Sequence, residues 1–144
     1  MARKTLTWKG KALTEKMRRA QKLGVNATMA KCVQDAKSNH TWQNQSGVLE
    51  GSIVIDVFAR DFERGVEGVW GSRDVVYARI QELGGTIRPT RAAKLAIPQP
   101  GGGVAFVDSV TIPARPYLRP AADKNYPDLV MNIRRAFEQG GAGA

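Results

Sequence analysis

The stretch SIVIDVFARDFERGVEGVWGS, residues 52 to 72, decides the fold because it contains the clearest β-strand pattern in the chain. Residues 52 to 60 are rich in β-branched side chains and alternate between two faces, one of which carries Ile53, Ile55 and Val57. Residues 65 to 72 are expected to return beside them as a shorter strand, with residues 61 to 65 as the connection. The sequence therefore predicts an antiparallel pair here.

Good helix formers fill the region before this pair, from residue 10 to residue 37. Apolar side chains recur there at helical spacing, at Leu13, Met17, Ala20, Ala27, Ala30 and Val33. Gly24 interrupts the pattern and Asn26 could cap a restart, so one kinked helix and two abutting helices both fit. Residues 38 to 47 are polar and predict a loop.

After the strand pair, residues 74 to 85 have the apolar spacing of a short helix ended by Gly84 and Gly85. Brief extended pieces follow at residues 86 to 90 and 94 to 98, and PQPGGG at 98 to 103 would close a hairpin. In residues 104 to 114 one face collects Val104, Phe106, Val110 and Ile112.

The tail is expected to be helical from Arg119, with its regular part beginning near Tyr126 because Pro127 fits only a first turn or a kink. Strands clustered between terminal helices predict an α+β fold. We expect one domain over residues 1 to 144: a small, mainly antiparallel sheet, a long N-terminal helical region and a C-terminal helix packed on it. Residues 1 to 9 form a basic arm and residues 139 to 144 a flexible tail.

The formal net charge is +9, and residues 1 to 40 contribute +8 of it. A segment this basic could contact nucleic acid or an acidic protein through long-range attraction, or it could be a solvated helix face. The candidate contact residues for DNA or an acidic partner are Lys9, Lys11, Lys16, Arg18, Arg19 and Lys22.

Hydrophobic residues make up 42% of the chain, which is ordinary for a globular protein and argues against a disordered or membrane protein. No run approaches the roughly 18 apolar residues that a membrane span requires, and no secretory signal pattern is visible. We therefore expect a protein made in a cytosol without a membrane partner.

The sequence contains little that would support catalysis or cofactor binding. A lone Cys32 and a lone His40 are too few for a structural zinc site, and no nucleophile, zinc or phosphate-loop motif is present. Glu63, Glu67 and Glu82 could approach one another after folding, but their spacing does not require it. We expect no enzyme activity and no cofactor. The scattered aromatics, Phe58, Trp42, Trp70 and Tyr77, are expected to be core or interface anchors.

Three motifs, taken in order, resemble a known family. They are HTWQNQSGVLEGSI at residues 40 to 53, YARIQELGG at 77 to 85 and IPARPYLRPA at 112 to 121. Together they resemble the small tail-completion or neck proteins of tailed bacteriophages, over about residues 10 to 138. The matched positions are Ser46, Gly47, Leu49, Ser52 and Ile53, then Tyr77, Ala78, Glu82 and Gly84, then Pro113, Ala114, Arg115, Pro116, Tyr117 and Leu118.

The resemblance implies a structural virion protein without catalytic activity. Such a protein would form a homo-oligomeric ring, expected to be hexameric, around the DNA channel where tail joins head, beside other neck and tail proteins. Two alternatives remain open: a protein that binds nucleic acid without sequence preference, and an assembly factor absent from the finished particle.

The proline-rich segment from Pro113 to Pro120 is expected to be a stiff, extended connector. A preordered segment loses little entropy on docking, so we expect it to supply one patch of the ring interface. The candidate interface residues are Pro113, Arg115, Pro116, Tyr117, Leu118 and Arg119. The alternative is that Tyr117 and Leu118 hold the last helix against the sheet of their own chain.

Overall fold

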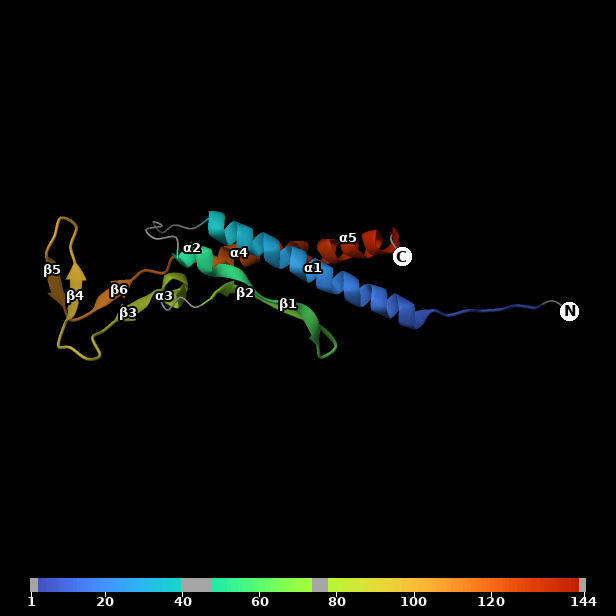
Figure 1. The fold of residues 1–144 in the computed structure, drawn as a ribbon, viewed down its shortest axis with the longest axis horizontal. Helices are drawn as coiled ribbons and strands as arrows, with labels where there is room; N and C mark the ends of the chain where they lie inside the picture. Colours follow the sequence, from blue (N-terminus) through green and yellow to red (C-terminus); the bar gives the residue numbers. More distant parts are fainter. Residues whose placement is uncertain (1–2, 40–47, 74–77, 143–144) are drawn as a thin grey trace.

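The computed structural model describes residues 3 to 39, 48 to 73 and 78 to 142, and it confirms the α+β fold (Figure 1). Its helices are α1 (Gly10–Ser38), α2 (Val48–Ser52), α3 (Ala78–Leu83), α4 (Leu118–Asn125), the 3-10 turn η1 (Tyr126–Asp128) and α5 (Leu129–Ala142). Its strands are β1 (Ile53–Phe62), β2 (Gly65–Ser72), β3 (Gly85–Ile87), β4 (Leu95–Pro98), β5 (Val104–Val107) and β6 (Val110–Ile112). The strands form three antiparallel pairs, β1–β2, β3–β6 and β4–β5.

Helix α1 is one helix of 29 residues, so the two-helix alternative is wrong. Gly24 does not end the helix but allows α5 to approach it, because a Cβ atom at Gly24 would lie 2.7 Å from the Cα of Ile133. Asn26 does not cap a restart either. Its Oδ1 accepts a hydrogen bond of 2.7 Å from the backbone N–H of Ala59, which ties α1 to β1.

The predicted strand pair is confirmed as the β1–β2 hairpin, and it is longer than expected. The strands reach Phe62 and Gly65, so Glu63 and Arg64 alone form the turn, and Glu63 adopts a left-handed φ of 50°. Both strands pack against α1, which covers one face of the hairpin. In Figure 1, α5 lies alongside α1.

The three motifs of the family resemblance meet in one hydrophobic core. Its buried members are Ala36 from α1, Leu49 and Ile53 from the first motif, Ala78 from the second, and Tyr117 and Ala121 from the third. Residues 40 to 47, with His40, Trp42, Ser46 and Gly47, and residues 74 to 77, with Tyr77, lie outside the described residues. The described parts of these motifs therefore build the core.

Residues 85 to 112 form a two-part β-ribbon, β3–β6 followed by β4–β5, which projects from one end of the molecule (Figure 1). The predicted hairpin at PQPGGG is confirmed, and Gly101, Gly102 and Gly103 all have positive φ angles there. The predicted single face over residues 104 to 114 is wrong, because the pairing partner changes from β4 to β3 at residues 108 and 109. Val104 and Phe106 are exposed, whereas Val110 and Ile112 are half-buried.

The C-terminal region is helical from Leu118, next to the predicted start at Arg119, but its regular part begins there with α4 and not near Tyr126. Pro120 lies in the first turn of α4, where its missing N–H leaves no helical hydrogen bond unmade. Pro127 lies at the start of the 3-10 turn η1 between α4 and α5, and a first turn is one of the two places that the sequence allowed for it. Helix α5 continues to Ala142, so residues 139 to 142, which we assigned to a flexible tail, are helical.

A buried carboxylate joins α1 to α4. Asp35 is buried and accepts a hydrogen bond of 2.7 Å from Asn125 Nδ2, and Lys124 and Lys31 lie 3.4 and 3.7 Å from its oxygens. The bond from Asn125 holds the pKa of the Asp35 carboxyl below its usual value, although burial acts in the opposite direction.

This geometry predicts a loss of stability in acid. A carboxyl whose pKa is lower in the folded than in the unfolded chain stabilises the fold above the unfolded pKa of about 3.9, and that contribution disappears as the pH falls through the folded pKa. We expect urea midpoints to fall between pH 5 and pH 2 more steeply for the wild type than for Asp35→Asn. Equal slopes for the two proteins would contradict this role of Asp35.

Candidate assembly interface

The second and third motifs are joined by one side chain, Glu82 of α3. Its Oε2 accepts hydrogen bonds from the backbone N–H groups of Tyr117 (2.7 Å) and Leu118 (3.0 Å), and its Oε1 accepts one from Arg119 (2.9 Å). The first N–H groups of a helix have no partner within the helix, and α4 has no capping side chain of its own. Glu82 therefore supplies the N-terminal cap of α4 from a distant part of the chain.

Tyr117 is an internal anchor. It is 1% exposed, its hydroxyl lies 2.6 Å from Ser72 Oγ, and burial raises its pKa. Leu118 is half-buried and packs against the same core. Tyr117 and Leu118 therefore hold the C-terminal region against their own chain, which is the second of the two roles proposed for them. Any intermolecular contact of the segment from Pro113 to Pro120 must use its other residues.

Those other residues, Pro113, Arg115, Pro116 and Arg119, are exposed. The Arg115 backbone N–H donates to Gln81 O at 2.7 Å, and its guanidinium makes no ion pair with any residue that the structure describes. Arg119 Nε lies 3.9 Å from Asp123 Oδ2, an exposed pair of little energetic weight. Arg115 is therefore available for an intermolecular contact.

The six basic candidates divide into two groups. Three are held by their own chain: Arg18 Nε and Lys22 Nζ lie 3.7 and 3.2 Å from Asp61 of β1, and Lys16 Nζ lies 4.1 Å from the centre of the Phe137 ring. The other three are exposed and form no ion pair within the described ranges: Lys9, Lys11 and Arg19. The structure thus ties three of the six candidate side chains to other parts of the chain.

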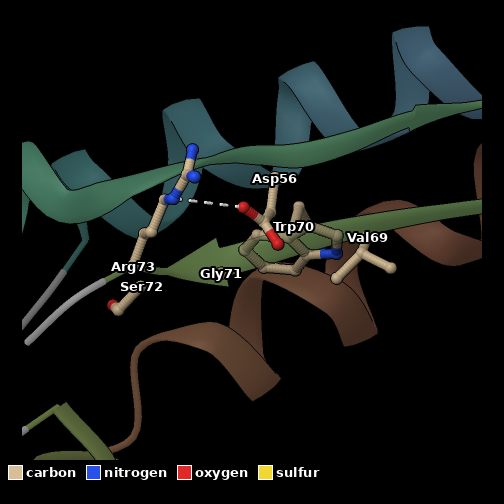
Figure 2. A pocket seen from close by; sticks show the side chains of 6 residues that line it. All are labelled: Asp56, Val69, Trp70, Gly71, Ser72 and Arg73. Atoms are coloured by element: carbon tan, nitrogen blue, oxygen red, sulfur yellow. Dashed lines mark ion pairs between the residues drawn. The ribbon is translucent and has the colours of Figure 1, made fainter.

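The face of the β1–β2 hairpin turned away from α1 is open to solvent; we call it the open face. Its outward side chains include Phe58, which is 63% exposed, and Val69 beside the carboxylates of Asp56 and Glu67. A shallow hollow of about 260 Å³ lies at its base and is lined by Asp56 and Arg73. In Figure 2 these two side chains point toward each other, and Asp56 Oδ1 lies 3.4 Å from Arg73 Nε. The open face combines exposed apolar side chains with negative charge.

The tip of the ribbon, β4–β5, is apolar on both faces. Ala96 and Pro98 pair with Phe106 and Val104 on one face, and Leu95 and Ile97 pair with Val107 and Ala105 on the other. Phe106 is 65% exposed. An isolated two-stranded hairpin is marginal in water, and monomers rarely expose such apolar surface without a partner.

Sequence reasoning treated Glu63, Glu67 and Glu82 as a potential carboxylate group, but the structure gives them different surroundings. Glu67 pairs with Arg60 across the hairpin at 3.9 Å, whereas Glu82 caps α4. The sequence contains one indication that Glu82 caps α4. This helix begins without the Ser, Thr, Asp or Asn that usually caps a helix, so its acceptor has to come from elsewhere in the chain.

No group of three potential metal ligands exists among the described residues. The helices described here include none with the length and apolarity of a membrane span.

Comparison with known proteins found no matching family model, no matching curated protein and no matching solved structure.

Proposed function

We propose that the chain is a structural subunit of the head-to-tail junction of a tailed bacteriophage. Copies of it would form a ring around the DNA channel, located in the neck or tail of the virion and in contact with other neck and tail proteins. The three motifs of the family resemblance support the phage assignment. The large exposed area of the folded chain supports self-assembly.

The observation that carries the proposal is the exposed area. The chain exposes 10908 Å², whereas a folded monomer of 15.7 kDa is expected to expose about 7,300 Å². The excess is about half of the expected area. The exposed arm of residues 3 to 9 contributes part of it, and apolar surface on two separate elements, the open face and the ribbon tip, contributes another part. Two different patches on one subunit suit a heterologous contact that repeats and closes into a ring.

The experiment is a measurement of the solution mass of the purified protein over a range of concentrations, followed by electron microscopy of the assembled fraction. We expect a closed ring with a mass several times that of the 15.7 kDa chain, and six copies are the expected number. A monomer at every concentration, or an open filament with no rings, would contradict the proposal.

A second candidate function is binding of nucleic acid without sequence preference. The observation in its favour is the net charge of +9 together with exposed Lys9, Lys11 and Arg19. Such contacts would reach phosphates and weaken steeply with salt. A monomer that binds duplex DNA at low salt and releases it at high salt would favour this function over the ring. A ring that is absent from purified particles would instead favour a transient assembly factor.

A further inference from the structure

The β-ribbon, residues 85 to 112, lies apart from the rest of its own chain. Each half pairs internally, β3 with β6 and β4 with β5, but none of these strands packs on a described helix or on β1–β2 beyond isolated contacts. In Figure 1 the ribbon lies at one end of the molecule, and α3 lies between the ribbon and the β1–β2 hairpin. The ribbon tip therefore does not cover the open face of its own subunit.

The two surfaces have complementary apolar content. On the ribbon tip, Phe106 and Val104 stand out from a hairpin whose paired residues are all apolar. On the open face, Phe58 and Val69 are exposed on the side of the hairpin that α1 does not cover. Neither surface is covered by another described element of the chain, and each presents an exposed phenylalanine suited to anchor an interface.

Their charges are also opposite. The ribbon and the segment that leaves it, residues 85 to 116, carry four cationic side chains and one carboxylate: Arg88, Arg91, Lys94, Arg115 and Asp108. The β1–β2 hairpin is acidic in a strongly basic chain, with four carboxylates against two arginines: Asp56, Asp61, Glu63, Glu67, Arg60 and Arg64. Within the chain, Asp56 pairs with Arg73, Asp61 with Arg18 and Lys22, and Glu67 with Arg60. Glu63 at the turn has no ion-pair partner among the described residues. Lys94 pairs with Asp108 within the ribbon at 3.9 Å, so the cations that a second copy offers to the acidic hairpin are Arg88, Arg91 and Arg115.

We propose that the ribbon tip of one subunit lies on the open face of the next subunit. This inference rests on the proposed self-assembly and names its interface. Each subunit would give its ribbon to one neighbour and receive the ribbon of the other, so the contact is heterologous and can close into a ring.

The test uses three charge-introducing variants of the full chain and a measurement of mass. Phe106→Asp damages only the ribbon tip, Phe58→Asp damages only the open face, and Val130→Asp, at a position on α5 that is 76% exposed, is the control. We expect the wild type and the control to assemble equally. Each of the two phenylalanine variants is expected to lose assembly and remain monomeric, with a urea midpoint close to that of the wild type.

Mixing the two monomeric variants gives the sharper result. The intact ribbon of Phe58→Asp can dock on the intact open face of Phe106→Asp, but the reverse contact is damaged on both sides. We therefore expect the mixture to form one-to-one dimers and nothing larger. If either variant assembles like the wild type, or if the mixture stays monomeric, the proposed interface is wrong, and another partner covers the ribbon.

Cross-linking keeps the test decisive if an aspartate variant unfolds. Phe58→Cys mixed with Phe106→Cys should form dimers with a short bismaleimide at least tenfold more efficiently than either variant alone. The native thiol does not interfere, because Cys32 is fully buried and burial raises its pKa to about 11. Absence of mixed cross-links in an assembled protein would overturn the interface but leave the proposed function standing. A monomeric wild type would overturn both.

Discussion

Replacing Glu82 by Ala is expected to lower the free energy of unfolding by about 3 kcal/mol. The carboxylate accepts three backbone hydrogen bonds of 2.7 to 3.0 Å at the start of α4, and two of the donors are part-buried. Without Glu82 these N–H groups lose an anionic acceptor, and α3 loses one of its attachments to the start of α4. Urea denaturation at one fixed protein concentration measures the loss.

Two comparisons make the Glu82 prediction specific. Glu138→Ala removes a carboxylate from an exposed pair with Arg134 on α5 and should cost less than about 0.5 kcal/mol. Glu82→Gln keeps one acceptor oxygen and should lie between Glu82→Ala and the wild type. Hydrogen exchange at Tyr117, Leu118 and Arg119 should accelerate in Glu82→Ala. If Glu82→Ala is no less stable than Glu138→Ala, the side chain is not the cap that the structure shows.

Replacing Gly24 by Ala should destabilise the fold by about 2 kcal/mol, although alanine is the better helix former. The added Cβ would lie 2.7 Å from both the backbone N and the Cα of Ile133, and backbone atoms cannot move aside as a flexible side chain can. Overpacking of this kind costs about 3 kcal/mol, and the higher helix propensity of alanine returns about 1 kcal/mol.

Gly140→Ala is the matched control, because Gly140 also lies in a helix but has no atom within 4 Å of its would-be Cβ. It should leave stability unchanged or raise it by up to about 1 kcal/mol. Thermal or urea unfolding of both variants checks the contrast. A Gly24→Ala protein as stable as Gly140→Ala would show that α1 and α5 do not pack as closely as described.

Several elements followed from local pattern. Alternating β-branched residues predicted the β1–β2 hairpin, PQPGGG predicted the β4–β5 turn, and Pro127 marked the kink before α5. Each of these depends on backbone preferences and side-chain periodicity within a few neighbours, which the sequence records directly. The α+β class followed from the order of those elements.

The candidate interface was predicted less well, for a different physical reason. Proline stiffness indicated a docking edge around Tyr117, but stiffness does not say which side of a segment faces its own core. That choice was made by Ser72 and Glu82, which lie far away in the sequence. The exposed ribbon was also hidden from sequence reasoning, because apolar strands have the same pattern whether the body of the chain or a neighbouring subunit covers them.

Gly24 and Glu82 have structural roles that depend on residues far away in the sequence. From the sequence, Gly24 was compatible with a kinked helix or with two abutting helices, and Glu82 was one of three glutamates that could approach one another. In the folded chain the glycine admits Ile133, more than a hundred residues away, and the glutamate caps a helix that begins at Leu118. Short-range propensities were therefore sufficient for the β1–β2 and β4–β5 hairpins and for the helical character of both terminal regions, but not for α2 or the β3–β6 pair. Only the tertiary structure decided that Gly24 is a packing contact, that Glu82 is a helix cap and that the apolar β4–β5 strands stay uncovered. Each of these roles depends on residues that folding brings together from distant parts of the sequence.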